Sequence, residues 1–174
     1  MMKKQIPLIL LCLLIMACAK APADKSGSSA ANSTDPPPIA STDVVKATPQ
    51  EATLTRGQSV EIIVPIKITN GYHVNANPAS FPYLIPIELK IAPASGIAVE
   101  FIRYPDPVTK KFTFAEAPLK VYEGETLVKA SLNTDKSAPT GRHNLSAKLR
   151  VQACDDKVCY APGEIDLTLP VDVK

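Results

Sequence analysis

Apolar and polar side chains alternate along most of the chain beyond residue 50. The clearest run covers residues 59–69, where β-branched side chains occupy every second position: Val60, Ile62, Val64, Ile66 and Ile68. A period of two is typical of a strand that buries one face and leaves the other in solvent. Asn70-Gly71 follows at once and predicts a turn. This region is therefore predicted to be a strand that ends in a tight turn.

The same alternation recurs further along the chain. Shorter stretches lie at residues 84–91, 97–102, 119–122 and 126–132, and two longer ones lie at residues 144–154 and 164–173. Within the second stretch, Ile97, Val99 and Phe101 are expected on one face, and the two longest stretches predict a β-hairpin. Helical periodicity is not found over ten or more residues. About seven strands with frequent Pro and Gly turns favour an all-β, immunoglobulin-like antiparallel sandwich, and a partly closed barrel fits the same pattern.

The first eighteen residues have the features of an export signal. Lys3 and Lys4 precede an apolar run over residues 6–16 that is too short to span a bilayer, and Ala17 stands before Cys18. Residues 15–18 (IMAC) resemble the lipobox of bacterial lipoproteins. That resemblance implies cleavage before Cys18 and acylation of its sulfur, with a palmitate-type lipid holding the chain to a membrane. An ordinary cleaved signal with a chance cysteine is the alternative.

The segment after Cys18 has the composition of a tether. Residues 19–50 are rich in Ala, Ser, Pro, Asp and Lys, with few large apolar side chains. Such a segment cannot bury enough surface to offset the entropy lost on ordering. The expected organisation is a signal peptide over residues 1–17, a disordered tether over 18–50 and one folded domain over 51–174.

The net charge of the mature chain and its expected location indicate which classes of partner it has. Loss of Lys3 and Lys4 with the signal leaves 17 basic against 17 acidic residues, and the chain has no Trp. A neutral chain without a basic stripe makes nucleic acid an unexpected partner. Residue 19 is Ala rather than Asp, so the lipoprotein sorting rule favours the outer membrane in a Gram-negative host, with the domain facing the periplasm.

Two cysteines of the mature chain carry the candidate chemistry. Cys12 leaves with the signal and Cys18 is taken by the lipid, so Cys154 and Cys159 have only each other. Export permits a disulfide, and facing positions of a hairpin lie near the Cα separation that a disulfide needs. Cys154 is in register with the polar residues of its strand, so its sulfur is expected off the core.

The residues alone leave the role of this pair open. Closing a loop of about six residues stabilises a fold by only about 2 kcal/mol, so a sandwich of this size does not need the bridge. A redox role and a structural role are equally compatible with these arguments. Two cysteines without further ligands do not form a structural zinc site, and neither a metal nor a cofactor is expected.

A family resemblance favours the redox role. Residues 151–162 (VQACDDKVCYAP) resemble the cysteine segment of the N-terminal periplasmic domain of the thiol:disulfide interchange protein DsbD. Residues 71–78, 83–86 and 119–124 are similar to further stretches of that family in the same order. The resemblance implies an immunoglobulin-like domain whose Cys154 and Cys159 cycle between dithiol and disulfide, taking electrons from a thioredoxin-like domain and passing them to periplasmic oxidoreductases.

The resemblance also implies a cap over the sulfurs. Members of the family place an aromatic ring there, and its position before residues 121–122 assigns the role to Phe112 or Phe114, although both also suit core residues at period two. Tyr160 is expected to form a wall of the site. We interpret His73 as a hydrogen-bonded structural residue beside a turn.

The expected function is therefore a lipid-anchored thiol-disulfide exchange module that works with thioredoxin-like or other envelope thiol-disulfide proteins. Whether it acts as an enzyme component stays open at this point, as does the direction of electron flow. The full interchange protein continues into a membrane domain and a thioredoxin-like domain, so a stand-alone copy is expected to obtain electrons from another chain. The alternative is a non-catalytic binding or assembly lipoprotein with a structural disulfide.

Overall fold

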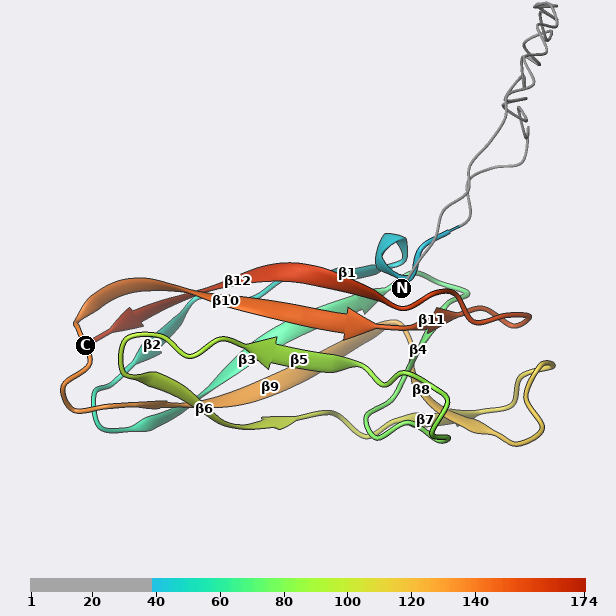
Figure 1. The fold of residues 1–174 in the computed structure, drawn as a ribbon, viewed down its shortest axis with the longest axis horizontal. Helices are drawn as coiled ribbons and strands as arrows, with labels where there is room; N and C mark the ends of the chain where they lie inside the picture. Colours follow the sequence, from blue (N-terminus) through green and yellow to red (C-terminus); the bar gives the residue numbers. More distant parts are fainter. Residues whose placement is uncertain (1–38) are drawn as a thin grey trace, which may run out of the picture. The chain divides into compact units, whose positions relative to one another are not determined.

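The computed structural model describes residues 39–174, so the signal segment, Cys18 and most of the expected tether lie outside the described residues. The described residues form three four-stranded sheets (Figure 1). The first contains β1 (Val45–Ala47), β3 (Ser59–Ile68), β9 (Glu125–Thr134) and β6 (Ile97–Arg103), in that order. The second contains β2 (Ala52–Leu54), β12 (Gly163–Val173), β10 (Gly141–Val151) and β5 (Glu88–Ile91). The third contains β11 (Ala153–Cys154), β4 (His73–Asn75), β8 (Leu119–Tyr122) and β7 (Val108–Lys110).

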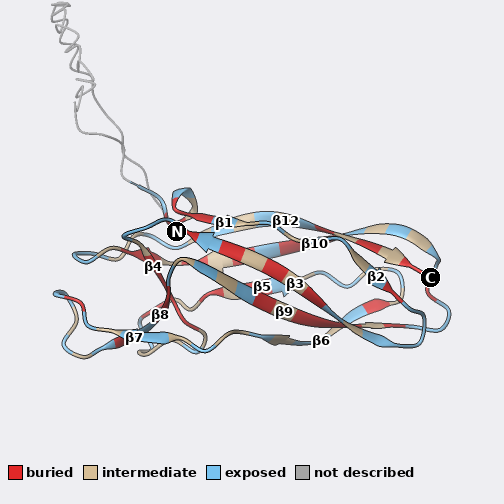
Figure 2. Ribbon diagram, turned by 180° about the vertical axis from the view of Figure 1, so that it is seen from behind, coloured by how far each residue is buried: buried red, intermediate tan, exposed pale blue. Residues whose placement is uncertain are grey.

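The first two sheets pack face to face and enclose the main core. Along β3, buried side chains alternate with intermediate or exposed ones, as the burial colours of Figure 2 show, and most of the second half of β9 is buried. Ile62, Val64, Ile66 and Ile68 are all buried, as the period of two predicts. The strand pairs are antiparallel except β12 with β2. The predicted immunoglobulin-like sandwich is confirmed.

The predicted long hairpin is also present. Strands β10 and β12 pair antiparallel over their whole length, from Gly141 opposite Val173 to Val151 opposite Gly163. Their connection, residues 152–162, carries both cysteines. The period of two over this stretch was long enough to define both strands, but the predicted alternation continues to Cys154, beyond the point where the pairing ends at Val151.

One face assignment is wrong, because β6 contains a bulge. Its register with β9 shifts between Val99 and Phe101, so the extra residue reverses the alternation beyond it. Ile97 stays buried, whereas Phe101 is exposed and Arg103 lies over its ring. A bulge of this kind leaves no mark in a pattern of apolar residues.

Ordered structure begins before the expected boundary at residue 50. A 3-10 turn, η1 (Ser41–Asp43), leads into β1, which pairs with the end of β3. Val44 and Val45 are buried in the main core. These two adjacent apolar residues within an otherwise polar segment supply enough burial to hold the strand.

The third sheet carries the site and has a small core of its own. Leu84, Phe112, Leu119 and Val121 form this second cluster, with Phe81 packed against it. In Figure 1 this sheet and the hairpin connection lie at one end of the sandwich, away from the C-terminal residue. Within residues 39–174, no helix has the length and apolar character needed to cross a membrane.

Candidate functional site

The expected disulfide between Cys154 and Cys159 is present in the hairpin connection. The sulfur atoms lie 2.10 Å apart and the Cα atoms 3.9 Å apart. Two backbone hydrogen bonds frame the bridge, one from Asp155 N to Val158 O at 2.9 Å and one from Tyr160 N to Ala153 O at 2.8 Å. The cysteines thus face each other across a tight turn, as their spacing indicated.

The two cysteines differ in exposure, and the expectation for Cys154 is wrong. Cys154 is 1% exposed, whereas Cys159 is only partly buried. The alternation of β10 stops at Gln152, and the chain continues as β11, which pairs with β4 instead of β12. Ala153 and Cys154 are therefore consecutive buried residues, and a partner has readier access to Cys159.

Asp155 organises the turn between the cysteines. One carboxylate oxygen accepts hydrogen bonds from the N–H groups of Lys157, at 2.7 Å, and Val158, at 2.8 Å. The other accepts one from the Tyr160 hydroxyl at 2.7 Å. The Tyr160 hydroxyl, followed by the Lys157 N–H, holds the pKa of the Asp155 carboxyl below its usual value. The same carboxylate raises the pKa of Tyr160 to about 12.

Tyr160 thereby acts as a strut beside Cys159, and its ring lies 6.0 Å from that of Tyr72. The expected place of Tyr160 as a wall of the site stays a prediction, as does its role in the chemistry.

Two polar residues outside the turn fix the hairpin to the domain. Ser41, fully buried in η1, accepts a hydrogen bond from Ala153 N at 3.0 Å and donates one to Ala161 O at 2.6 Å. Gln152 accepts from Asn75 Nδ2 and donates to Tyr160 O. Gly163 leaves room for η1, since a Cβ at this position would lie 2.7 Å from Thr42 Cγ2. The base of the hairpin is thus held from both sides.

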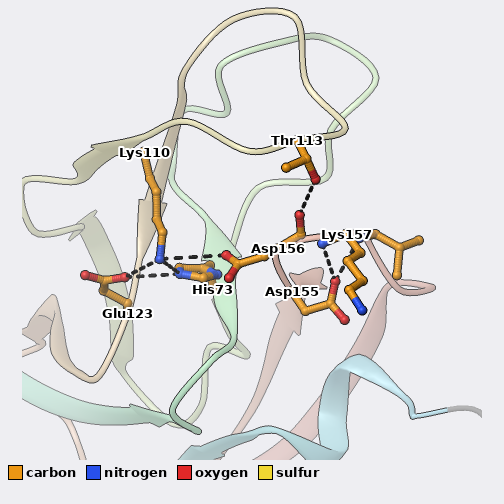
Figure 3. Close-up of polar contacts among 8 residues, drawn as sticks. His73, Lys110, Thr113, Glu123, Asp155, Asp156 and Lys157 are labelled. Atoms are coloured by element: carbon orange, nitrogen blue, oxygen red, sulfur yellow. Dashed lines mark hydrogen bonds and ion pairs between the residues drawn. The ribbon is translucent and has the colours of Figure 1, made fainter.

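Residues 110–115, from the last residue of β7 into the loop before β8, form a segment beside the cysteine turn, which we call the cap segment. Phe112 is 3% exposed and Phe114 is 39% exposed, with their ring centroids 5.2 Å apart. The Thr113 hydroxyl donates a hydrogen bond to Asp156 O at 2.7 Å, which ties the segment to the turn (Figure 3). Phe112 also meets the His73 ring edge-on at 5.0 Å. The two candidate rings thus occupy different environments, one in the small core and one in solvent.

A charged cluster joins the cap segment to the sheet. Lys110 Nζ lies 2.5 Å from His73 Nε2, 3.6 Å from Glu123 Oε2 and 4.0 Å from Asp156 Oδ1 (Figure 3). His73 Nε2 is also 3.2 Å from Glu123 Oε2. His73 is hydrogen-bonded, as interpreted from the sequence, but it is also 2% exposed and pairs with Cys154 across the third sheet.

Sequence reasoning did not single out Lys110, Glu123, Ser41 or Gln152. These residues come from segments far apart in the chain, and their proximity depends on how the third sheet docks. Asp155 carried a detectable signal, because Asp before a turn commonly accepts backbone N–H bonds two and three residues ahead. Among the described residues, no group of three or more His, Cys, Asp and Glu side chains is arranged to hold a metal.

The fold and the cysteine turn together define a disulfide-bearing immunoglobulin-like domain. The family model described as the N-terminal domain of thiol:disulfide interchange protein DsbD matches residues 42–170, and the chain belongs to this family. No curated protein matches the chain.

Solved structures with a similar fold include two bacterial domains. The N-terminal domain of Neisseria meningitidis DsbD in its reduced form is 19% identical with a TM-score of 0.50, covering 83% of this chain and 95% of that one. The N-terminal periplasmic domain of ScsB from Proteus mirabilis is 16% identical with a TM-score of 0.48, covering 74% and 45% respectively. At 19% identity, the likeness to the Neisseria meningitidis domain concerns the fold alone.

Proposed function

We propose that this domain is a thiol-disulfide exchange module of the cell envelope, in which Cys154 and Cys159 pass electrons between a thioredoxin-like donor and other envelope proteins. The observation that carries the proposal is a disulfide in the hairpin connection with one buried and one accessible cysteine, in a chain of the DsbD N-terminal family. A bridge across about six residues contributes little to stability, which leaves exchange as the better reason for it. Exchange between thiols and disulfides requires no cofactor.

The difference in exposure assigns the attacked sulfur. In the reductive direction, a thiolate of the donor attacks Cys159 Sγ, and the bond to Cys154 breaks with its electron pair going to Cys154 Sγ. The second thiol of the donor then attacks the donor's own sulfur in the mixed disulfide and releases Cys159 as a thiolate. The donor dithiol is oxidised to a disulfide, and its two protons end on Cys154 and Cys159. The reverse sequence reduces an envelope disulfide.

The cap segment restricts this exchange to partners that can displace it. Phe112 anchors the segment in the small core, and Thr113 and Lys110 attach it to the cysteine turn. The exposed ring of Phe114 is available for contact with an incoming domain. A small thiol is kept from the disulfide by the closed cap segment. A docked thioredoxin-like protein contributes contact energy that opens the segment.

Single-cysteine variants test both the function and the choice of sulfur. Cys154→Ala retains the accessible thiol. It should displace a small thiol from a thioredoxin-like protein that lacks its second cysteine and carries that small thiol as a mixed disulfide on its first, and non-reducing gels detect the resulting complex. Cys159→Ala retains only the buried thiol and should form much less of this complex. The wild-type pair should equilibrate in a thiol redox buffer at a potential above about −300 mV. A potential well below that value, with no mixed disulfide from either variant, would show a structural bridge in a binding or assembly lipoprotein.

The proposed module is held at the membrane by a lipid on Cys18, with the domain facing the periplasm. The lipobox-like residues 15–18 support this placement, and Ala19 favours the outer membrane in a Gram-negative host. Growth with a radioactive fatty acid should label the wild-type protein and leave Cys18→Ala unlabelled. Equal labelling of the two proteins would remove the anchor from the proposal without affecting the exchange chemistry.

A further inference from the structure

His73 lies directly opposite the buried cysteine of the pair. Its Cα partner in the antiparallel ladder of β4 and β11 is Cys154. Residues opposite each other in such a ladder project to the same face, with Cβ atoms about 5 Å apart. Both residues are almost fully buried, so a polar interaction between them is shielded from water.

The contacts of Nε2 determine where the ring proton lies. Two groups face Nε2: the Lys110 ammonium at 2.5 Å, which can only donate, and the Glu123 carboxylate at 3.2 Å, which can only accept. An Nε2 that accepts from the nearer partner, Lys110, leaves the ring proton on Nδ1. That atom is buried and has no hydrogen-bond partner among residues 39–174. A buried donor without a partner is costly, so a partner in another state of the protein is a physical explanation for it.

The side chain that carries this unpartnered Nδ1 is the cross-strand neighbour of Cys154. In the disulfide the sulfur is a weak acceptor, whereas a thiolate is a strong one. We propose that His73 Nδ1–H donates a hydrogen bond to the Cys154 thiolate that forms when the bridge opens. This inference rests on the proposed function, in which Cys154 is the leaving sulfur.

The surrounding charges support the same role. Lys110 on β7 holds the ring in the Nδ1–H tautomer and adds a positive charge behind it, while Glu123 after β8 also faces Nε2. Asp156 in the turn faces Lys110 at 4.0 Å. An ionised carboxylate donates no hydrogen bond, so neither Glu123 nor Asp156 stabilises a thiolate. A donor on Nδ1 therefore makes Cys154 a better leaving sulfur, since a more stable thiolate leaves faster.

A thiolate titration of Cys154 tests this role without any partner protein. In the full chain with Cys159→Ala, thiolate absorbance is followed against pH and corrected with the matched protein that lacks both Cys154 and Cys159. Adding His73→Phe, which keeps the ring against Phe112, should move the titration to higher pH and lower the thiolate population at neutral pH roughly tenfold or more. Adding His73→Asn should preserve most of the thiolate, because its amide N–H falls where Nδ1–H lies.

Two results would overturn the inference: His73→Phe titrating like its parent, or His73→Asn shifting as far as His73→Phe. If His73→Phe does not fold, nitrogen NMR of the His73 ring in the wild-type protein decides. The Nδ1–H tautomer, with its proton resonance moving on reduction of the disulfide, supports the inference, and an Nε2–H tautomer contradicts it. Failure of the mixed-disulfide experiment alone would refute the exchange function and leave this titration unaffected, so the two outcomes are distinguishable.

Discussion

Replacing Phe112 with alanine removes the largest side chain of the small core beneath the cap segment. The ring is 3% exposed and packs with Leu84, Leu119 and Val121, and His73 meets it edge-on. Truncation of a buried Phe costs about 3 to 5 kcal/mol of unfolding free energy. The lower end is expected here, because the cluster is small and its neighbours can partly fill the space.

Part of this loss should appear as local opening of the cap segment. If the whole of about 3 kcal/mol is lost locally, the population of open molecules rises roughly a hundredfold, and reduction of the disulfide by dithiothreitol accelerates by up to that factor. Urea unfolding of the oxidised protein measures the loss of global unfolding free energy. The rate of disulfide reduction under native conditions measures how often the cap segment opens locally. Phe114→Ala is the matched control, since its ring is 39% exposed and its loss should cost well under about 1 kcal/mol.

The reasoning would be refuted if Phe112→Ala kept both its unfolding free energy and its rate of reduction. It would also be refuted if Phe114→Ala accelerated reduction more than Phe112→Ala, since the exposed ring would then be the cover. If both variants accelerated reduction equally and only Phe112→Ala lost stability, the whole cap segment, rather than one ring, would be what shields the disulfide.

Three further predictions concern the turn. Asp155→Ala should lower the pKa of Tyr160 from about 12 toward 10.0, measured by NMR of the Tyr160 ring, and an unchanged pKa would exclude the hydrogen bond. The pKa of the Asp155 carboxyl is held below 3.8 in the folded protein. The stability that the ionised Asp155 carboxylate adds to the fold should therefore be complete above pH 3.8 and lost as the pH falls through the lowered pKa. The difference in melting temperature between wild type and Asp155→Ala should accordingly close in acid. Replacing both Cys154 and Cys159 with alanine should cost only about 2 kcal/mol in urea unfolding, and a double variant that does not fold would indicate an essential staple.

The strands and the cysteine hairpin followed from the sequence because a period of two persists wherever a strand keeps one buried face. That regularity ends at the last residue pair of the ladder between β10 and β12, Val151 opposite Gly163. The prediction for Cys154, which lies beyond this pair, was wrong. The chain leaves β12 at Gln152 and pairs with β4, which buries two adjacent residues. Which neighbour a two-residue strand selects depends on tertiary packing, and the alternation cannot report it. The bulge that exposes Phe101 is a second case of the same kind.

The cysteine pair itself was predictable, because Cys154 and Cys159 lie far from the two N-terminal cysteines and their spacing suits a turn. The surroundings of the pair were not. Lys110, Glu123 and His73 are separated by up to fifty residues, and each is unremarkable alone. Their contact exists because β4 and β8 pair, and β7 lies outside β8. The two rings of Phe112 and Phe114 could likewise not be distinguished until the small core was known.

The switch of residues 153–154 from the sheet of β10 to the sheet of β4 also makes the two cysteines of the site differ in exposure. A hairpin that continued the ladder of β10 and β12 would have placed Cys154 on the polar side, with both sulfurs facing solvent. Transfer of Ala153 and Cys154 to the edge of β4 instead buries Cys154 in the strand position opposite His73 and leaves Cys159 at the turn. Ser41 holds that transfer in place by binding Ala153 N and Ala161 O on the two sides of the turn. An attacking thiolate therefore has one accessible sulfur, and the leaving sulfur is in a fixed polar environment, which is the arrangement that directional exchange requires.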